Sequence, residues 1–264
     1  MPRSVRALQA TIRALLDHQP GPFMNAALAS DVAGAQTLDI MASAPRYNAW
    51  QYEAIAPYIG SRVLEVGSGI GNMSLHLVEG PRELVVLTDT DEWYRDQLRA
   101  RFGTRSNVVV DSLTLPDDRA PIGFARHRLD TVVALNVVEH IPDDVGALRT
   151  MGGMVSRGGR VVVLVPALEA LFGSLDRELQ HQRRYTRRTL RAAAEAAGLR
   201  VEALFWFNFV GTLGWWWNAK VRRTPRIPAD QLRVFDALVP LLRLERHLPL
   251  PCAQSLILVG VNDA

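Results

Sequence analysis

The stretch that decides the fold reads Val63-Leu64-Glu65-Val66-Gly67-Ser68-Gly69-Ile70-Gly71-Asn72. Its first four residues form an apolar run with the length and composition of a buried strand. The three glycines that follow carry no Cβ, so a ligand can approach the backbone closely there. Residues 70–78 are expected to form a helix whose N-terminal N–H groups face that ligand. The stretch therefore predicts a nucleotide-binding turn in an α/β fold.

The spacing of the glycines separates two classes of nucleotide-binding turn. A dinucleotide fingerprint reads G-x-G-x-x-G, whereas this chain reads E-x-G-x-G-x-G and places Asn72 where the third dinucleotide glycine would fall. An NAD-dependent oxidoreductase is therefore the less favoured hypothesis.

Further landmarks follow the glycine turn in order. Asp89 ends a second apolar run, and a carboxylate about 20 residues beyond the first glycine binds the ribose hydroxyls in nucleotide-binding α/β folds. Asp91 competes for that role. Asp111 ends a third apolar run, and a fourth leads into Asn136-Val137-Val138-Glu139-His140-Ile141-Pro142. Asp89 and Asp111 could instead be helix caps or turn residues.

The motif VLEVGSGIGNMS and these landmarks resemble the class I S-adenosylmethionine-dependent methyltransferases. The resemblance implies an α/β, Rossmann-like fold with a seven-stranded, mostly parallel sheet, an antiparallel last strand, and S-adenosyl-L-methionine as cofactor. In the family, the acid after the third strand binds the adenine amino group. The cofactor-binding residues that it implies here are Tyr47, Glu65, Gly67, Gly69, Gly71, Asp89, Thr90, Asp111, Ser112, Leu113 and Asn136. For Tyr47, aromatic packing on the sheet is an equal alternative.

Composition limits the function classes. The 264 residues are 48% hydrophobic, which suits one domain, residues 1–264, with residues 1–46 as an N-terminal helical extension. A net charge of +3 is too mild for a nucleic-acid binder. The single cysteine, Cys252, excludes an intramolecular disulfide and a cysteine-zinc cluster. Residues 1–18 are expected to form an amphipathic helix, no 18-residue apolar run occurs, and a cytoplasmic location is expected.

Alternating patterns predict the remaining elements. Strands are expected near residues 84–88, 107–111, 129–136, 159–165, 199–207 and 256–261, and helices near 47–58, 91–102, 143–156 and 187–197. Arg157-Gly158-Gly159 is expected to end the helix before the fifth strand.

Residues 208–252 are predicted to be a helical cap inserted between strands six and seven. The cap contains Trp215-Trp216-Trp217, two adjacent arginines and an amphipathic stretch over residues 231–247. Such a cap could be a lid over an apolar substrate, with Trp216 as a contact, a homodimer surface, or a peripheral membrane contact. Ordinary internal packing is the alternative.

A second candidate element follows the fifth strand. The sequence there resembles a bacterial methyltransferase subgroup with a loop of the form L-x-G-S-x-D…H-x-R-R-Y-T, although Gln180 replaces the usual glycine. Its Arg183, Arg184 and Tyr185 are predicted to bind a small-molecule substrate. Thr186 could be the N-cap of the next helix.

The predicted reaction is methyl transfer to oxygen or carbon of a small, apolar or lipid- or glycan-linked biosynthetic intermediate. His140 is the first candidate for the base that removes the acceptor proton, and His181 is the second. A supporting role beside Glu139 is the alternative for His140. No metal-binding set is evident, because Asp143-Asp144 resemble acids at a helix N-terminus. The competing hypothesis is a methyltransferase-like protein that binds the cofactor but catalyses a cyclisation or another non-methylating step.

Overall fold

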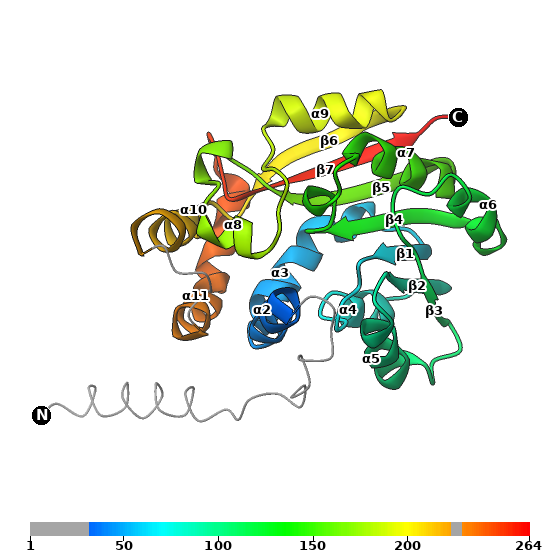
Figure 1. Ribbon diagram of the computed structural model, residues 1–264, viewed down its shortest axis with the longest axis horizontal. Helices are drawn as coiled ribbons and strands as arrows, with labels where there is room; N and C mark the ends of the chain where they lie inside the picture. The colour runs from blue at the N-terminus through cyan, green and yellow to red at the C-terminus, as the bar shows by residue number, and fades with distance from the viewer. Residues whose placement is uncertain (1–31, 223–228) are drawn as a thin grey trace, which may run out of the picture.

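A computed structural model describes residues 32–222 and 229–264 of the chain. Seven strands form one sheet in the order β3-β2-β1-β4-β5-β7-β6 (Figure 1). All paired strands are parallel except at β7, which is antiparallel to both neighbours. The strands are β1 (Arg62–Val66), β2 (Leu84–Asp89), β3 (Val108–Ser112), β4 (Leu129–Leu135), β5 (Val155–Pro166), β6 (Leu199–Phe207) and β7 (Ser255–Asn262). This confirms the predicted Rossmann-like fold class.

Helices cover both faces of the sheet (Figure 1). One face carries α6, α7 and α9, and the other carries α3, α4 and α5. The helices are α2 (Val32–Ala42), α3 (Pro45–Ile55), α4 (Ser74–Glu79), α5 (Glu92–Phe102), α6 (Ala120–Phe124), α7 (Asp144–Met154), α8 (Ser174–Glu178), α9 (Arg187–Ala196), α10 (Phe209–Trp216) and α11 (Ala229–Leu242). Short 3₁₀ helices are η2 (Ala56–Tyr58), η3 (Ala125–His127), η4 (Val138–His140), η5 (Glu169–Leu171) and η7 (Arg243–His247), and η6 (Trp217–Arg222) is a π-helix.

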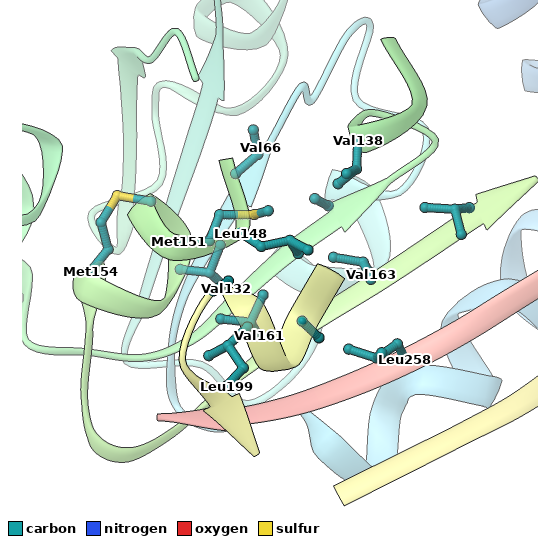
Figure 2. Close-up of a cluster of buried hydrophobic side chains, with 14 of the residues drawn as sticks. Val66, Val132, Val138, Leu148, Met151, Met154, Val161, Val163, Leu199 and Leu258 are labelled. Atoms are coloured by element: carbon teal, nitrogen blue, oxygen red, sulfur yellow. The ribbon is translucent and has the colours of Figure 1, made fainter. Parts of the chain in front are cut away.

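The central strands β1, β4 and β5 carry mostly apolar, buried side chains in their inner parts, because helices cover both faces of the sheet. Figure 2 shows the cluster on the α7 side, where Val132 and Val161 from the sheet lie beside Leu148 and Met151 of α7. On the other face, Trp50 of α3 belongs to a second buried cluster. This sandwich fixes the carboxyl ends of β1, β2 and β4, where the predicted site residues lie.

Two predicted boundaries are wrong. The helix after β1 begins at Ser74 rather than at residue 70, because Gly71 has φ +84° and a right-handed helix cannot pass through that conformation. The helix before β5 ends at Met154, and the chain enters the strand at Val155 with a register shift against β4. Gly158, with φ +78°, therefore lies in an irregular part of β5 and does not end a helix.

The segment between β6 and β7 is helical in its described part, as predicted. Within it, α11 packs against α3 through the buried Leu232 and Val239, and Asp236 accepts a 2.8 Å hydrogen bond from the Tyr47 amide. The predicted helix over residues 1–18 lies outside the described residues. Among the described helices, none is long and apolar enough to cross a membrane. The proposed division into extension, core and cap stays a prediction.

Candidate active site

The glycine loop after β1 is held in a shape that only small residues adopt. Gly67 has φ +66°, and a Cβ added there would lie 2.7 Å from Cγ2 of Val137. The amide of Ser68 donates to the carbonyl of Thr88 at 2.9 Å, which ties the loop to β2. The loop therefore presents bare backbone at the carboxyl edge of the sheet, where ligands of open α/β sheets bind.

Asp89 faces this loop. Its side chain accepts hydrogen bonds from the amides of Gly69 at 2.9 Å and Asp91 at 3.1 Å. Burial raises its pKa above the ordinary value. Asp91 instead caps α5, because its side chain accepts from the amide of Trp93 at 2.8 Å. Of the two candidates for the ribose, Asp89 is the one that contacts the glycine loop.

Glu65 lies beneath the loop rather than at its surface. It is 3% exposed and accepts a short hydrogen bond from the hydroxyl of Ser74, the first residue of α4. Burial raises the pKa of Glu65 to about 7, although that hydrogen bond opposes the shift. Glu65 therefore ties the end of β1 to the start of α4, and its contact with cofactor stays a prediction.

The end of β3 lies beside the end of β2. Asp111 pairs with Thr88 and Ser112 with Asp89 in the parallel register. Asp111 is half-buried, and its carboxylate accepts from the Ser112 amide at 2.8 Å. Thr90 and Ser112 are exposed, whereas the side chain of Leu113 is buried in the core. The two predicted carboxylates thus stand at neighbouring strand ends.

The N-terminal helix α2 covers the glycine loop. The Asn72 side-chain amide donates to the Leu38 carbonyl at 2.9 Å, and a Cβ at Gly69 would lie 2.7 Å from Leu38 Cδ1. Sequence reasoning missed Leu38, which belongs to no motif. Tyr47 is instead packed against Trp50, Phe207 and Phe235, which is the aromatic-packing alternative. Its cofactor contact stays a prediction.

The end of β4 brings the two candidate histidines together. Asn136 is exposed with φ +55°, and η4 places Glu139 in full burial and His140 at the surface. The loop after β5 returns to this point, where Gln182 donates its amide to the Glu139 carbonyl at 2.8 Å. The rings of His140 and His181 lie edge to face with centroids 4.8 Å apart.

A buried charge network supports His181. Its Nδ1 lies 3.0 Å from Asp176 Oδ1, and that oxygen also accepts from Arg184 Nε at 2.7 Å. Burial alone would raise the pKa of Asp176, but the His181 hydrogen bond and the Arg184 charge outweigh it and hold the pKa below its ordinary value. His181 Nε2 points to Glu139, 3.9 Å from its Oε1.

Glu139 is the least satisfied group in the network. Neither of its carboxyl oxygens has a hydrogen-bond partner among the described residues, and burial raises its pKa to about 8. One ligand atom each from Glu139, His140 and His181 lies within 4.8 Å of the others, so the three side chains could hold a metal ion. The sequence did not reveal this set, because the loop after β5 supplies His181.

The predicted substrate residues have different surroundings. Arg184 is fully buried, and its guanidinium stacks on the Trp215 ring, 4.6 Å from the centroid. Tyr185 is 2% exposed and donates its hydroxyl to Asp144 at 2.8 Å. Arg183 is partly exposed and pairs with the same carboxylate, while Trp216 is 48% exposed on α10. Each contact with substrate stays a prediction, and Thr186 is confirmed as the N-cap of α9.

Comparison with known proteins identifies the family. A family model described as a methyltransferase domain matches residues 24–204. The chain belongs to this methyltransferase family. Squalestatin hexaketide synthase from Phoma sp. (strain ATCC 20986 / MF5453) is 28% identical to the methyltransferase over 110 residues, which are 39% of this chain and 4% of that protein. The chain thus spans only a small fraction of the length of this relative.

Solved structures agree on the fold. A chain from the complex between the Haloferax volcanii Trm112 methyltransferase activator and a methyltransferase aligns with a TM-score of 0.59 at 17% identity, covering 89% of this chain and 99% of that chain. The [4+2]-cyclase SpnF aligns with a TM-score of 0.51 at 17% identity, covering 83% and 81%. At 17% identity, these similarities show a shared fold and nothing about activity.

The methyltransferase is S-adenosylmethionine-dependent, as predicted. The loop itself requires glycine at positions 67 and 71, because both residues have positive φ and an added Cβ would meet a neighbouring side chain within 2.7 Å. The two side chains of the loop, Ser68 and Ile70, are both buried. The backbone amides and the Asp89 carboxylate provide the polar groups there.

Proposed function

We propose that this methyltransferase transfers a methyl group to oxygen or carbon of a small, apolar biosynthetic intermediate, with His140 as the base. The observation that carries the proposal is the exposure of His140 at the end of β4, directly against His181. Strand β4 pairs with β1, so His140 and the glycine loop follow adjacent strands. A proton acceptor thus lies at the cofactor edge of the sheet.

The two histidines take different roles in this proposal. His181 is almost enclosed, and Asp176 holds its Nδ1, so it is a positioning residue. His140 is exposed and can reach the proton of an acceptor hydroxyl or an acidic carbon. A base of this kind contributes about 10²–10⁴-fold to a rate.

The remaining residues bind and align. When bound, S-adenosylmethionine supplies a sulfonium methyl group that carries its own leaving group. The glycine-loop amides, Asp89 and Asp111 would hold it through backbone, ribose and adenine contacts. Alignment of the acceptor with the methyl group supplies much of the rate, because reacting atoms held about 3–3.5 Å apart avoid most of the entropic barrier.

An apolar acceptor is supported by two observations. The relatives include squalestatin hexaketide synthase and a lovastatin nonaketide synthase, and a polyketide type of acceptor for this chain is part of the proposal. The segment over residues 208–252 carries aromatic side chains beside the loop after β5, where Trp215 stacks on Arg184. Lipid-linked and glycan-linked acceptors belong to the same proposal.

The test separates binding from turnover. Calorimetric titration with S-adenosylmethionine, S-adenosylhomocysteine and NAD is expected to show binding of the two adenosyl ligands and not of NAD. Release of S-adenosylhomocysteine is then measured with a 3-oxoacyl thioester as carbon acceptor, an alkylphenol as oxygen acceptor and a polyprenyl-linked sugar. Product with one of them supports the proposal. Cofactor binding without product from any acceptor favours the non-methylating alternative, whose fold SpnF shares.

A further inference from the structure

Large apolar side chains are exposed on one part of the molecule. Eleven such side chains are exposed among the described residues, and ten of them lie between Val210 and Leu248. The eleventh is Ile122 on α6, far from α10 and α11 in Figure 1. Single exposed apolar residues are ordinary, but a concentration of this kind marks an interaction surface.

Helix α11 is apolar on two sides. Leu232 and Val239 are buried against the body of the protein. Val234, Leu238 and Leu241 recur at i, i+4 and i+7, which places them on one face, and they are 63%, 44% and 65% exposed. A helix that needed only to pack on α3 would carry polar side chains on that outer face.

The neighbouring turn of helix extends the same chemistry. Trp216 and Trp217 are 48% and 46% exposed at the junction of α10 and η6, and Leu213 one turn earlier is 63% exposed. Tryptophan suits the boundary between water and lipid because its ring is apolar and its N–H is polar. We name the exposed apolar side chains of α10, η6, α11 and η7 the cap surface.

The cap surface lies in a cationic part of the chain. Residues 208–252 contain seven Lys and Arg against three Asp and Glu, whereas the whole chain has a net charge of +3. Two of those three acids are turned inward: Asp236 binds the Tyr47 amide, and Glu245 binds the amides of Asn208 and Phe209. Among the described side chains of this segment, Arg233, Arg243 and Arg246 then stand against Asp230 alone, which leaves a net positive charge.

The groove beside η7 has the same character. A cavity of about 460 Å³ is lined by Arg187, Arg243, Glu245 and Arg246 together with the exposed Leu248, which follows η7. Glu53 also lines it and pairs with Arg243 at 3.0 Å. Guanidinium groups next to exposed leucines form the pattern that binds an anionic headgroup above an apolar layer.

We propose that the cap surface docks on an anionic lipid bilayer and holds the enzyme at the membrane as a peripheral protein. The positive charge of this segment favours an anionic bilayer over a second copy of the chain as the binding partner. A two-fold interface would place the cationic segment of one copy against that of the other, and like charges repel. An anionic bilayer complements the arginines and takes up the leucines and tryptophans in its interface.

The test is sedimentation of the full chain with vesicles of phosphatidylcholine alone or mixed with phosphatidylglycerol. Binding is expected only with the anionic vesicles, and added salt should weaken it. Leu241→Gln should reduce vesicle affinity about tenfold or more, because burial of a leucine contributes about 1.5–3 kcal/mol. Ile122→Gln is the matched control, since Ile122 is equally apolar and 80% exposed, and its binding should equal that of the unaltered protein.

Three outcomes overturn the proposal. The first is no binding to anionic vesicles, and the second is equal losses in the Leu241 and Ile122 variants. The third is a dimer in light scattering that Leu241→Gln dissociates, which would assign the cap surface to a second copy. Calorimetry with S-adenosylmethionine on Leu241→Gln confirms that the variant is folded. Vesicle binding requires no methyl acceptor, so its failure leaves the proposed function standing.

Discussion

The Oδ2 atom of Asp89 accepts a hydrogen bond from the amide of Gly69 at 2.9 Å, which joins the end of β2 to the glycine loop after β1. The contact fixes the carboxylate beside the bare backbone of the loop. Asp89 is thus the carboxylate that contacts the glycine loop, whereas the Asp91 side chain caps the N-terminus of α5.

Asp89→Ala is expected to weaken S-adenosylmethionine binding about tenfold to a hundredfold, because hydrogen bonds to charged groups contribute about 1.5–3 kcal/mol. Calorimetry measures the change. Asp91→Ala is the control: it should cost about 1 kcal/mol of folding stability through the lost N-cap and leave affinity unchanged. Equal loss of affinity in the two variants would contradict the assignment.

Gly67→Ala is expected to lower the free energy of unfolding by about 1–3 kcal/mol, because alanine is strained at φ +66° and its Cβ would strike Val137. Gly158→Ala tests the strain without the clash, since its φ is +78° and nothing lies within 4 Å. Gly123→Ala has neither penalty and should be neutral or stabilising by up to about 1 kcal/mol. Urea unfolding measures the free energy of unfolding of the three variants. Equal losses in Gly67→Ala and Gly158→Ala would show that the contact with Val137 adds no cost.

His140→Gln is expected to lower kcat about 10²–10⁴-fold with S-adenosylmethionine affinity unchanged, because the base acts on the acceptor and not on the cofactor. His181→Gln should affect the rate less, since His181 only supports the first ring. A parallel assay with a chelator tests Glu139, His140 and His181 as metal ligands. Loss of activity on chelation would favour a metal-dependent mechanism over the base mechanism.

The sequence predicted the parts of the site that follow directly from local pattern. Apolar runs that end in Asp89 and Asp111 indicated two strand ends at one edge, and the parallel register places them side by side. The glycine turn was also predictable from the sequence, because only glycine fits at position 67. Such features depend on residues close in the chain.

Other features needed the tertiary structure. The sequence alone does not tell whether an arginine contacts substrate or is a buried charge. Arg184 is a buried charge, because it pairs with Asp176 of α8, and only the folded structure shows that pair. Leu38 reaches the glycine loop through the placement of α2, which no motif encodes. The start of α4 at Ser74 was missed because the positive φ of Gly71 is a property of the folded loop.

The buried carboxyl of Glu65 should make stability depend on pH. Its folded-state pKa of about 7 lies above the ordinary value of 4.5, so the folded protein keeps a proton that the unfolded chain releases. The free energy of unfolding should therefore fall as pH rises from 4.5 to 7 and then level off, by at most about 3 kcal/mol. Urea unfolding at pH 5 and pH 8 should show a smaller fall for Glu65→Gln. Glu83→Gln, at an exposed site, should retain the full fall, and parallel behaviour of both variants would refute the attribution.

The ion pair of Arg184 and Asp176 should be essential to folding stability, since both side chains are fully buried. Asp176→Asn leaves the guanidinium charge without its counterion and is expected to cost about 3–5 kcal/mol. The bidentate pair of Arg160 and Glu202 lies near the surface, so Glu202→Gln should cost less than about 1 kcal/mol. Urea unfolding compares the two variants. Arg184→Met with Asp176→Leu removes both charges, and recovery of most of the lost stability would show that the cost comes from the unpaired charge. A small cost for Asp176→Asn would instead mean that Arg184 keeps contact with water and can reach a substrate.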